Sequence, residues 1–121
     1  MIERIGQIAI RVEDTARATA FYRDALGLAF LFSAPPLAFF DCAGVRLMLS
    51  PAENPEEDHA ASPLYFTVSD LETTYQAYLQ RGVEFVDTPH QIADLGSHTL
   101  WMCFFKDSEG NLLALMSEVP K

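Results

Sequence analysis

The chain is poor in cysteine and contains no long apolar segment, and each shortage excludes a class of protein. Its two cysteines, Cys42 and Cys103, lie 61 positions apart inside apolar runs. That spacing forms neither a zinc pattern nor a disulfide framework, so we expect buried, reduced thiols. No apolar run approaches the roughly 20 residues that span a bilayer, and the first residues lack a signal-peptide pattern. We therefore expect a soluble, cytoplasmic protein without a membrane partner.

Positive charge is also scarce. Lysine and arginine total 8, aspartate and glutamate total 17, and the formal net charge is −9. Such a charge repels phosphate backbones, which excludes nucleic acid as a partner. Half of the 121 residues are apolar, which is enough to build a core without disulfides or metal. We expect a single domain over residues 1–121.

An internal repeat organises the sequence. Ile8–Asp14 (IAIRVED) resembles Leu64–Asp70 (LYFTVSD), 56 positions later. Each is a short alternating strand that ends in an aspartate suited to cap a helix. A helical pattern follows each copy and ends at a glycine, Gly27 or Gly82, the usual C-terminal cap. The positions that share one helical face are Ala18, Phe21, Tyr22, Ala25 and Leu26 in the first copy, and Leu71, Thr74, Tyr75, Tyr78 and Leu79 in the second.

The rest of each copy has the pattern of strands. The predicted strands are Leu28–Phe32, Leu37–Cys42 and Val45–Ser50 in the first copy, and Val83–Asp87, Thr99–Lys106 and Leu112–Ser117 in the second. The sequence therefore predicts an α+β fold made of two βαβββ units, residues 1–50 and 63–121. Residues 51–62 are acidic and contain two prolines, which indicates a solvated linker.

The strands have two unlike faces. One face is apolar throughout, as expected where a helix covers a sheet: Ile8, Ile10, Val12, Val45, Leu47, Leu49, Leu64, Phe66, Val68, Leu113 and Leu115. The other face is mixed and carries two arginines: Gln7, Ala9, Arg11, Arg46, Met48, Ser50, Tyr65, Thr67, Leu112, Ala114 and Met116. A mixed face suits the wall of a small-ligand cavity, and a face buried between subunits is the alternative.

The paired units resemble the vicinal oxygen chelate superfamily, the fold of glyoxalases and bleomycin-resistance proteins. The resemblance rests on Ile8–Asp14 before Phe21-Tyr22 and Leu26-Gly27-Leu28, and on Phe104–Leu113 (FFKDSEGNLL). It covers essentially the whole chain and implies a curved mixed sheet around a cup, with helices outside. The superfamily includes lyases, isomerases, dioxygenases, epimerases and antibiotic-binding proteins, so it implies no single reaction.

Metal-dependent members hold a divalent cation with four side chains of the inner face. The matching positions here are Gln7, Met48, Pro63 and Ala114. Gln7 alone offers an oxygen, because a thioether suits no hard cation and the other two positions have no donor. The resemblance therefore implies neither a metal nor another cofactor.

Acid–base candidates are few. The three histidines are His59, within the acidic linker, His90 and His98. His98 precedes a predicted inner strand, and it is the histidine that could serve as an acid or base near the cup. A surface histidine is the alternative. Tyr65 is the second candidate for this role.

Two arginines indicate an anionic ligand. Gln7 and Arg11 are four apart on one strand and therefore share a face. The pair resembles the first strand of glutathione-dependent glyoxalase I, in which the arginine grips a substrate carboxylate. Arg46 projects from another strand of the same face. The alternative is that each arginine pairs with a local carboxylate or extends from a strand end into solvent.

We predict a metal-independent protein that binds a small, anionic molecule, as in the bleomycin-resistance branch. The residues expected around the ligand are Gln7, Arg11, Phe40, Arg46, Met48, Tyr65 and Trp101. One alternative is a lyase or isomerase of the glyoxalase kind, with His98 or Tyr65 as acid and base. Another is a structural dimer whose cup is filled. We expect a C2 homodimer, with Leu37–Phe40 as a candidate contact.

Overall fold

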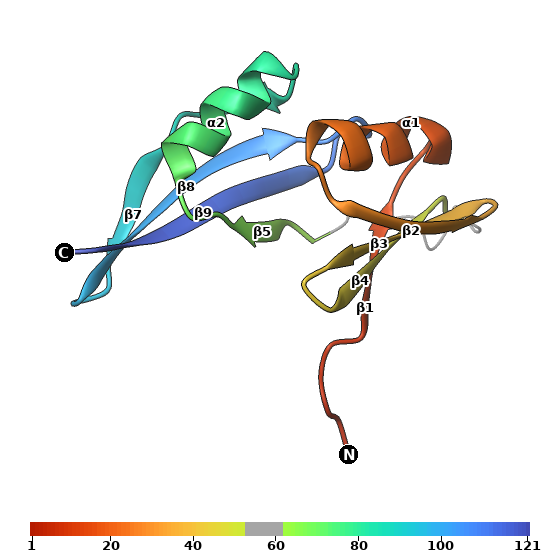
Figure 1. Cartoon of the computed structure of the whole chain (residues 1–121), viewed down its shortest axis with the longest axis horizontal. Coiled ribbons are helices and arrows are strands. Elements are labelled where there is room, and N and C mark those ends of the chain that lie inside the picture. The colour runs from red at the N-terminus through yellow and green to blue at the C-terminus, as the bar shows by residue number, and fades with distance from the viewer. Residues whose placement is uncertain (53–61) are drawn as a thin grey trace. The chain divides into compact units, whose positions relative to one another are not determined.

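Each half of the chain forms one sheet with one helical segment (Figure 1). The computed structural model describes residues 1–52 and 62–121. The chain divides into two compact units, Met1–Ala61 (unit 1) and Ser62–Lys121 (unit 2). Most of the predicted linker, with His59 and its acidic neighbours, lies outside the described residues. None of the helices in the described part has the length and hydropathy of a membrane span.

Unit 1 contains a four-stranded mixed sheet in the order β1-β4-β3-β2. Its elements are β1 (Gln7–Arg11), α1 (Thr15–Ala20), the π-helical turn η1 (Phe21–Ala25), β2 (Ala29–Ala34), β3 (Leu37–Cys42) and β4 (Val45–Ser50). β1 runs parallel to β4, and the other neighbours are antiparallel. α1 packs on β3 and β4.

Unit 2 contains a five-stranded mixed sheet in the order β5-β9-β8-β6, and β7 also pairs with β8. Its elements are β5 (Leu64–Thr67), α2 (Leu71–Gln80), β6 (Glu84–Phe85), β7 (His90–Asp94), β8 (His98–Lys106) and β9 (Leu112–Pro120). β5 is parallel to β9, which repeats the β1–β4 pairing of unit 1. The α+β fold built from βαβββ units is confirmed.

The two helix starts repeat each other closely. Asp14 has φ −127° and ψ 101°, and Asp70 has φ −131° and ψ 101°. Each carboxylate accepts a hydrogen bond of 3.0 Å from the backbone N–H three residues later, at Arg17 and Thr73. This is the N-cap geometry that the repeated aspartate predicted.

The strand that follows α2 differs from the prediction. The expected strand Val83–Asp87 is shorter, because only Glu84–Phe85 pairs as β6, and an unpredicted strand, β7, pairs further along β8. At the break, Asp87 accepts a hydrogen bond of 2.7 Å from the N–H of Phe104, so a side chain takes the place of a backbone carbonyl. Pro89 follows and has no N–H to give.

The helical face of unit 1 also departs from a regular α-helix. The segment continues after Ala20 as a π-turn, in which the N–H of Leu26 bonds to the carbonyl of Phe21. Ala18, Tyr22 and Leu26 are buried, as predicted, whereas Phe21 and Ala25 are only partly buried. In α2 the predicted face is wrong at one position, since Leu79 is 40% exposed.

The core of each unit lies between its helix and the covered face of its sheet. Fully buried side chains in unit 1 include Ile10, Val12, Tyr22, Phe40 and Leu49, and those in unit 2 include Cys103, Phe105, Leu113 and Leu115. The strand alternation therefore leaves the opposite face of each sheet, the open face, without a helix of its own unit.

Candidate functional site

The open face of unit 1 brings together side chains from β1, β3 and β4. Strand register places Gln7, Arg46 and Asp41 in one row, and Ala9, Met48 and Phe39 in the next. Because successive side chains of a strand alternate, these residues share the side opposite Ile10, Leu47 and Phe40. Gln7 and Arg46 are exposed on this face, and Met48 is partly exposed.

Gln7 and Arg46 form an ordered polar pair. The Nε of Arg46 donates to the Oε1 of Gln7 over 2.8 Å, and the Nε2 of Gln7 donates to the Sδ of Met48 over 3.6 Å. The guanidinium of Arg46 lies 5.0 Å from the ring centroid of Phe39. Stacking and hydrogen bonding therefore orient Arg46 while leaving its two Nη groups without an acceptor among the described residues.

A pocket of about 580 Å³ opens beside this pair. Its lining includes Arg4, Gln7, Leu31, Asp41 and Arg46. The carboxylate of Asp41 accepts the N–H of Gly44 over 3.2 Å, which holds the β3–β4 turn. Two arginines and one aspartate give the lining a formal charge of +1, although the whole chain carries −9. This local charge favours an anion.

Arg11 does not join this pocket. Its guanidinium forms an ion pair of 3.3 Å with Glu13, two residues further along. The prediction that Arg11 would need a ligand as its counter-ion is therefore wrong. Glu13 lies just past the end of β1, so the local carboxylate named as the alternative is the partner of Arg11.

The residues at the superfamily's metal positions do not fit a metal. In unit 1 the amide oxygen of Gln7 already accepts from a guanidinium, and a cation placed there would meet Arg46. Met48 offers a thioether, Pro63 has no side-chain donor, and Ala114 is a fully buried methyl group. The described residues also contain no group of three or more histidine, cysteine, aspartate or glutamate side chains placed to hold an ion.

The open face of unit 2 is apolar and aromatic. Register places Tyr65, Ala114 and Phe104 in one row and Thr67, Met116 and Met102 in the next. Tyr65 and Phe104 meet edge to face with ring centroids 5.8 Å apart, and Tyr65 remains 48% exposed. Tyr65 thus lies on the open face, as the sequence predicted.

Phe40 and Trp101 lie on the covered faces instead. Phe40 is fully buried against Tyr22, at 6.1 Å between ring centroids. Trp101 alternates with buried Cys103 and Phe105, on the side of β8 that α2 covers. The expectation that Phe40 lines the open face is therefore wrong, and the register of β8 decides the face of Trp101, which the alternation of the sequence left open. Phe39, which the prediction missed, is the open-face ring of β3, where it stacks on Phe32 at 4.6 Å.

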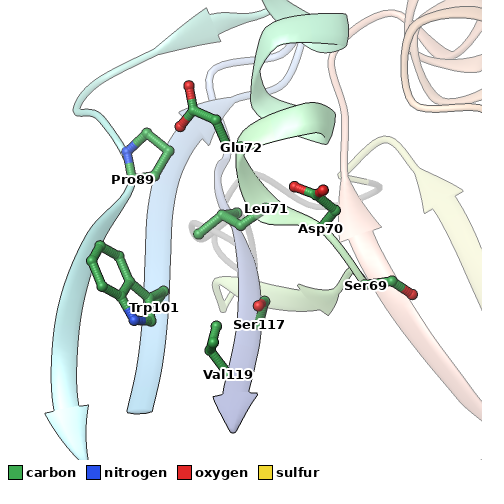
Figure 2. Close-up of a pocket in the computed structure, with 8 residues that line it drawn as sticks. All are labelled: Ser69, Asp70, Leu71, Glu72, Pro89, Trp101, Ser117 and Val119. Carbon is green, nitrogen blue, oxygen red and sulfur yellow. The ribbon is translucent and has the colours of Figure 1, made fainter. Parts of the chain in front are cut away.

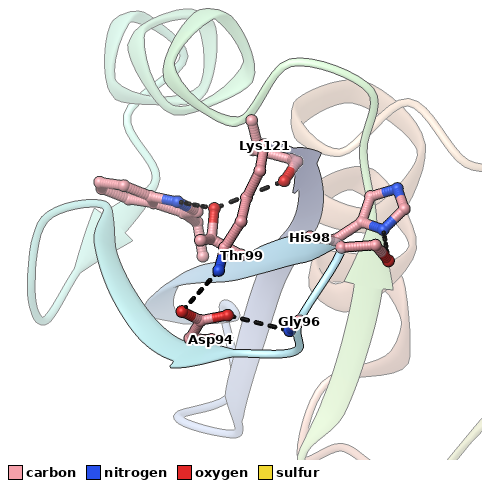
Figure 3. A network of polar contacts seen from close by, with 8 residues as sticks. Asp94, Gly96, His98, Thr99 and Lys121 are labelled. Atoms are coloured by element: carbon pink, nitrogen blue, oxygen red, sulfur yellow. Dashed lines mark hydrogen bonds and ion pairs between the residues drawn. The ribbon is translucent and has the colours of Figure 1, made fainter.

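The two acid–base candidates are far apart. His98 shares the open side of β8 with Phe104, beside Tyr65, but six residues separate His98 from Phe104, about 20 Å along a strand. The Nδ1 of His98 lies 2.8 Å from the Oγ of Ser97 (Figure 3). The fold therefore does not bring His98 and Tyr65 together on one small substrate.

The two cysteines differ in burial. Cys103 is fully buried and its pKa rises to about 12, chiefly through burial and further through the charges of Asp87 and Glu72. Cys42 is only partly buried, so the expectation of two buried thiols holds for Cys103 alone. Burial, with the charge of Asp41, also raises the pKa of Cys42. Neither thiol has the depressed pKa of a nucleophile.

The paired βαβββ units, each a mixed sheet with one helical segment, define a class of small α+β proteins. Residues 4–115 match the family described as the Glyoxalase/Bleomycin resistance protein/Dioxygenase superfamily. The match covers most of the chain, and the protein belongs to this superfamily.

Individual relatives are more distant. The chain is 28% identical over 125 aligned positions to "Uncharacterized protein YetH" of Bacillus subtilis (strain 168), covering 95% of this chain and 98% of that protein. It is 33% identical over 73 positions to "Metallothiol transferase FosB" of Staphylococcus haemolyticus (strain JCSC1435), covering 58% of this chain and 52% of that protein. A superfamily member from Sphaerobacter thermophilus has a TM-score of 0.81 at 20% identity, with 97% and 98% of the two chains covered.

Proposed function

We propose that this protein binds a small anionic molecule without a metal ion, and that the ligand's negative group contacts Arg46 in the unit 1 pocket. The observation that carries the proposal is the guanidinium of Arg46. Gln7 and Phe39 orient it, no described carboxylate pairs with it, and it faces a pocket of about 580 Å³. An arginine with both Nη groups available can form two parallel hydrogen bonds to a carboxylate or phosphate.

Arg4 gives the pocket its second positive charge. Its Nη1 donates to the carbonyl of Gly44 over 3.3 Å, which positions the guanidinium beside the β3–β4 turn. With Arg46 it would flank the negative group of a ligand, while Leu31 offers an apolar surface to the ligand's carbon part. A cavity of this size accepts a small organic molecule.

Binding is favoured over catalysis by the composition of the site. A lyase or isomerase of the glyoxalase kind needs a proton-transferring group beside the substrate, and the unit 1 pocket is lined by arginine, glutamine, leucine, glycine and one aspartate held by the turn. Tyr65 and His98 belong to unit 2 and lie far from each other. A filled, purely structural site is disfavoured by the open pocket at Arg46.

Titration with benzoate at constant ionic strength, followed by NMR, tests the proposal. We expect saturable shifts of the Arg46 Nε–H and Gln7 side-chain amide resonances, and much smaller shifts with uncharged benzyl alcohol. Arg46→Met should weaken benzoate binding by about tenfold, because one charge-assisted pair is lost at a partly solvated site. Arg11→Met is the matched control and should change little, because Arg11 already pairs with Glu13.

A second variant separates charge from shape. Gln7→Glu would place a carboxylate against the Nε of Arg46, and we expect it to abolish benzoate binding while the fold is kept. Equal binding of benzoate and benzyl alcohol, or unchanged binding in both Arg46→Met and Gln7→Glu, would contradict the proposal.

Metal independence has its own test. Because three of the four superfamily metal positions carry no hard donor, benzoate affinity should be the same before and after dialysis against a chelator. A loss of binding that stoichiometric zinc or nickel restores would show that a metal participates.

We also propose that the protein forms a homodimer through β2. The predicted contact Leu37–Phe40 is unsuitable, because Ala38, Phe39 and Phe40 are almost completely buried. β2 is instead an edge strand of its sheet, and three successive large apolar residues, Phe30, Leu31 and Phe32, are 39–47% exposed on it. An exposed apolar edge strand is a ready surface for pairing with another chain. Analytical ultracentrifugation at tens of micromolar should give the dimer mass, and Leu31→Lys should give the monomer.

A further inference from the structure

Unit 2 contains a second pocket, on the side of the sheet that α2 covers (Figure 2). Its volume is about 380 Å³, and it lies where the start of α2 meets β8 and the end of β9. The lining residues are Ser69, Asp70, Leu71, Glu72, Pro89, Trp101, Ser117 and Val119. The pocket shares no residue with the unit 1 pocket and contains none of the superfamily's metal positions.

The charge of the lining selects a cation. Asp70 and Glu72 supply two carboxylates, and the lining has no basic side chain. The N-terminus of α2 would by itself attract an anion, but Asp70 caps it and Glu72 lies in its first turn. The carboxylate of Asp70 already accepts from the backbone N–H and the hydroxyl of Thr73 and from the N–H of Glu72. The Oε1 of Glu72 accepts from Gln76, which leaves the other oxygen of Glu72 for a ligand.

Trp101 adds an aromatic wall. Its indole Nε1–H donates to the Oγ1 of Thr99 over 3.0 Å, and the hydroxyl of Thr99 donates in turn to the carbonyl of Val119 over 3.5 Å (Figure 3). These bonds satisfy the indole N–H and hold the ring, so that its surface faces the pocket with Pro89 and Leu71. An aromatic surface beside carboxylates is a typical environment for an organic ammonium ion.

Ser117 supplies an independent sign of a ligand. The residue is only 4% exposed, yet its hydroxyl has no hydrogen-bond partner among the described residues. Every fully buried side-chain oxygen in the described part of the chain has a hydrogen-bond partner. The unpaired hydroxyl of Ser117 must therefore be accessible, and it opens into the pocket that Ser117 lines. A hydroxyl that opens into a pocket and has no protein partner can accept an N–H from a bound group.

We propose that this pocket binds a primary organic ammonium ion with an apolar or aromatic carbon part. The ammonium group would donate to the Ser117 hydroxyl and to the Glu72 and Asp70 carboxylates. The carbon part would lie against Trp101, Leu71, Pro89 and Val119. The site is separate from the anion site of unit 1, so the two proposals stand or fall independently.

Trp101 is the only tryptophan of the chain, so its emission reports on this pocket directly. Titration with 2-phenylethylammonium should change the emission saturably. The uncharged analogue 2-phenylethanol should bind at least about tenfold more weakly, because it loses the charge-assisted hydrogen bonds. Benzyltrimethylammonium keeps the charge but has no N–H, and it should also bind more weakly than the primary amine.

Two variants test the assigned groups. Glu72→Gln and Ser117→Ala should each weaken 2-phenylethylammonium binding several-fold, with circular dichroism unchanged. Glu84→Gln is the matched control, since it makes the same charge change on an exposed residue of β6 outside the lining, and it should bind like the native protein. The unit 1 variant Arg46→Met should also leave amine binding unchanged.

The absence of saturable change with 2-phenylethylammonium would overturn the proposal. So would equal affinity for 2-phenylethanol, which would indicate an apolar pocket without charge selection. Equal weakening in Glu72→Gln and Glu84→Gln would attribute the effect to net charge and would also overturn the site.

Discussion

The two units follow one plan but differ on their open faces. Unit 1 presents an ordered glutamine–arginine pair there, whereas unit 2 presents Tyr65, Phe104 and Met116. The helix starts are nearly identical in the two units, down to the φ and ψ of the capping aspartates. The capping and helix-facing positions therefore determine the fold, whereas the residues of the open faces differ between the two units.

The largest expected contrast between the units lies in thiol reactivity. We expect Cys42 to react with a disulfide reagent at least about a thousandfold faster than Cys103, because Cys103 is fully buried and becomes accessible only when the unit unfolds. Burial also holds the pKa of Cys103 at about 12, which removes the reactive thiolate. Absorbance kinetics on Cys42→Ser and Cys103→Ser measure the two rates separately. Similar rates would show that Cys103 is accessible without unfolding of unit 2.

The two cores should respond alike. Phe40→Ala in unit 1 and Phe105→Ala in unit 2 each remove a fully buried ring, and each should lower the free energy of unfolding by about 3–5 kcal/mol. Urea denaturation followed by circular dichroism measures both. Phe104→Ala, which changes a partly exposed ring of the open face, is the control and should cost less. A small effect in one core only would contradict the equivalence of the units.

The last hairpins of the two units should differ. In unit 2 the buried carboxylate of Asp107 accepts from the N–H groups of Glu109 and Asn111, each at 2.8 Å, and from the side chain of Asn111 at 2.9 Å. In unit 1 the partly exposed Asp41 accepts from Gly44 at 3.2 Å. Asp107→Ala should cost about 2–3 kcal/mol, because buried N–H groups lose a charged acceptor, and Asp41→Ala about 1 kcal/mol or less. Equal losses in urea denaturation would show that the hairpins are equivalent.

The smallest expected effect concerns two exposed carboxylates. A hydrogen bond from the backbone N–H of Thr73 lowers the pKa of Asp70, and a hydrogen bond from Arg23 lowers that of Asp24. Each folded-state pKa lies below the unfolded one, so the stabilisation is present above the ordinary aspartate pKa and is lost as pH falls through the folded value. In Asp70→Asn and in Asp24→Asn, the melting temperature should therefore decrease less between about pH 5 and about pH 3 than it does in the native protein. Added salt should suppress the Asp24 effect more, since that partner is an exposed charge. Equal suppression of the two effects by salt would contradict the assignment of a backbone N–H partner to Asp70 and a charged partner to Asp24.

Much of the fold was predictable because its signals are local. The repeated aspartates at residues 14 and 70 and the glycines at residues 27 and 82 specify helix ends by themselves. β3 and β4 have the predicted bounds because their mainly apolar segments lie between strong turn signals. β7 was missed because His90–Asp94 is mostly polar and exposed, and its strand conformation depends on pairing with β8.

The site was predictable only in part. Alternation placed Gln7, Arg46, Met48 and Tyr65 on the open faces, since their strands are apolar on one side and mixed on the other. Phe39 and Phe40 are both apolar, and so are most residues of β8, so composition could not assign Phe40 or Trp101 to a face. Register with β4 and β9 decided it.

The sequence by itself determined the superfamily, the two βαβββ units and the loss of metal donors, because each depends on residue type and on spacing along the chain. The tertiary structure decided which arginine is available to a ligand. Arg11 and Arg46 have the same charge and lie on the same face, but one meets Glu13 and the other meets Gln7 and Phe39. It also decided that Ser117 and Trp101 share a pocket with the start of α2. Such partnerships depend on which side chains the folded strands and loops bring within hydrogen-bonding distance.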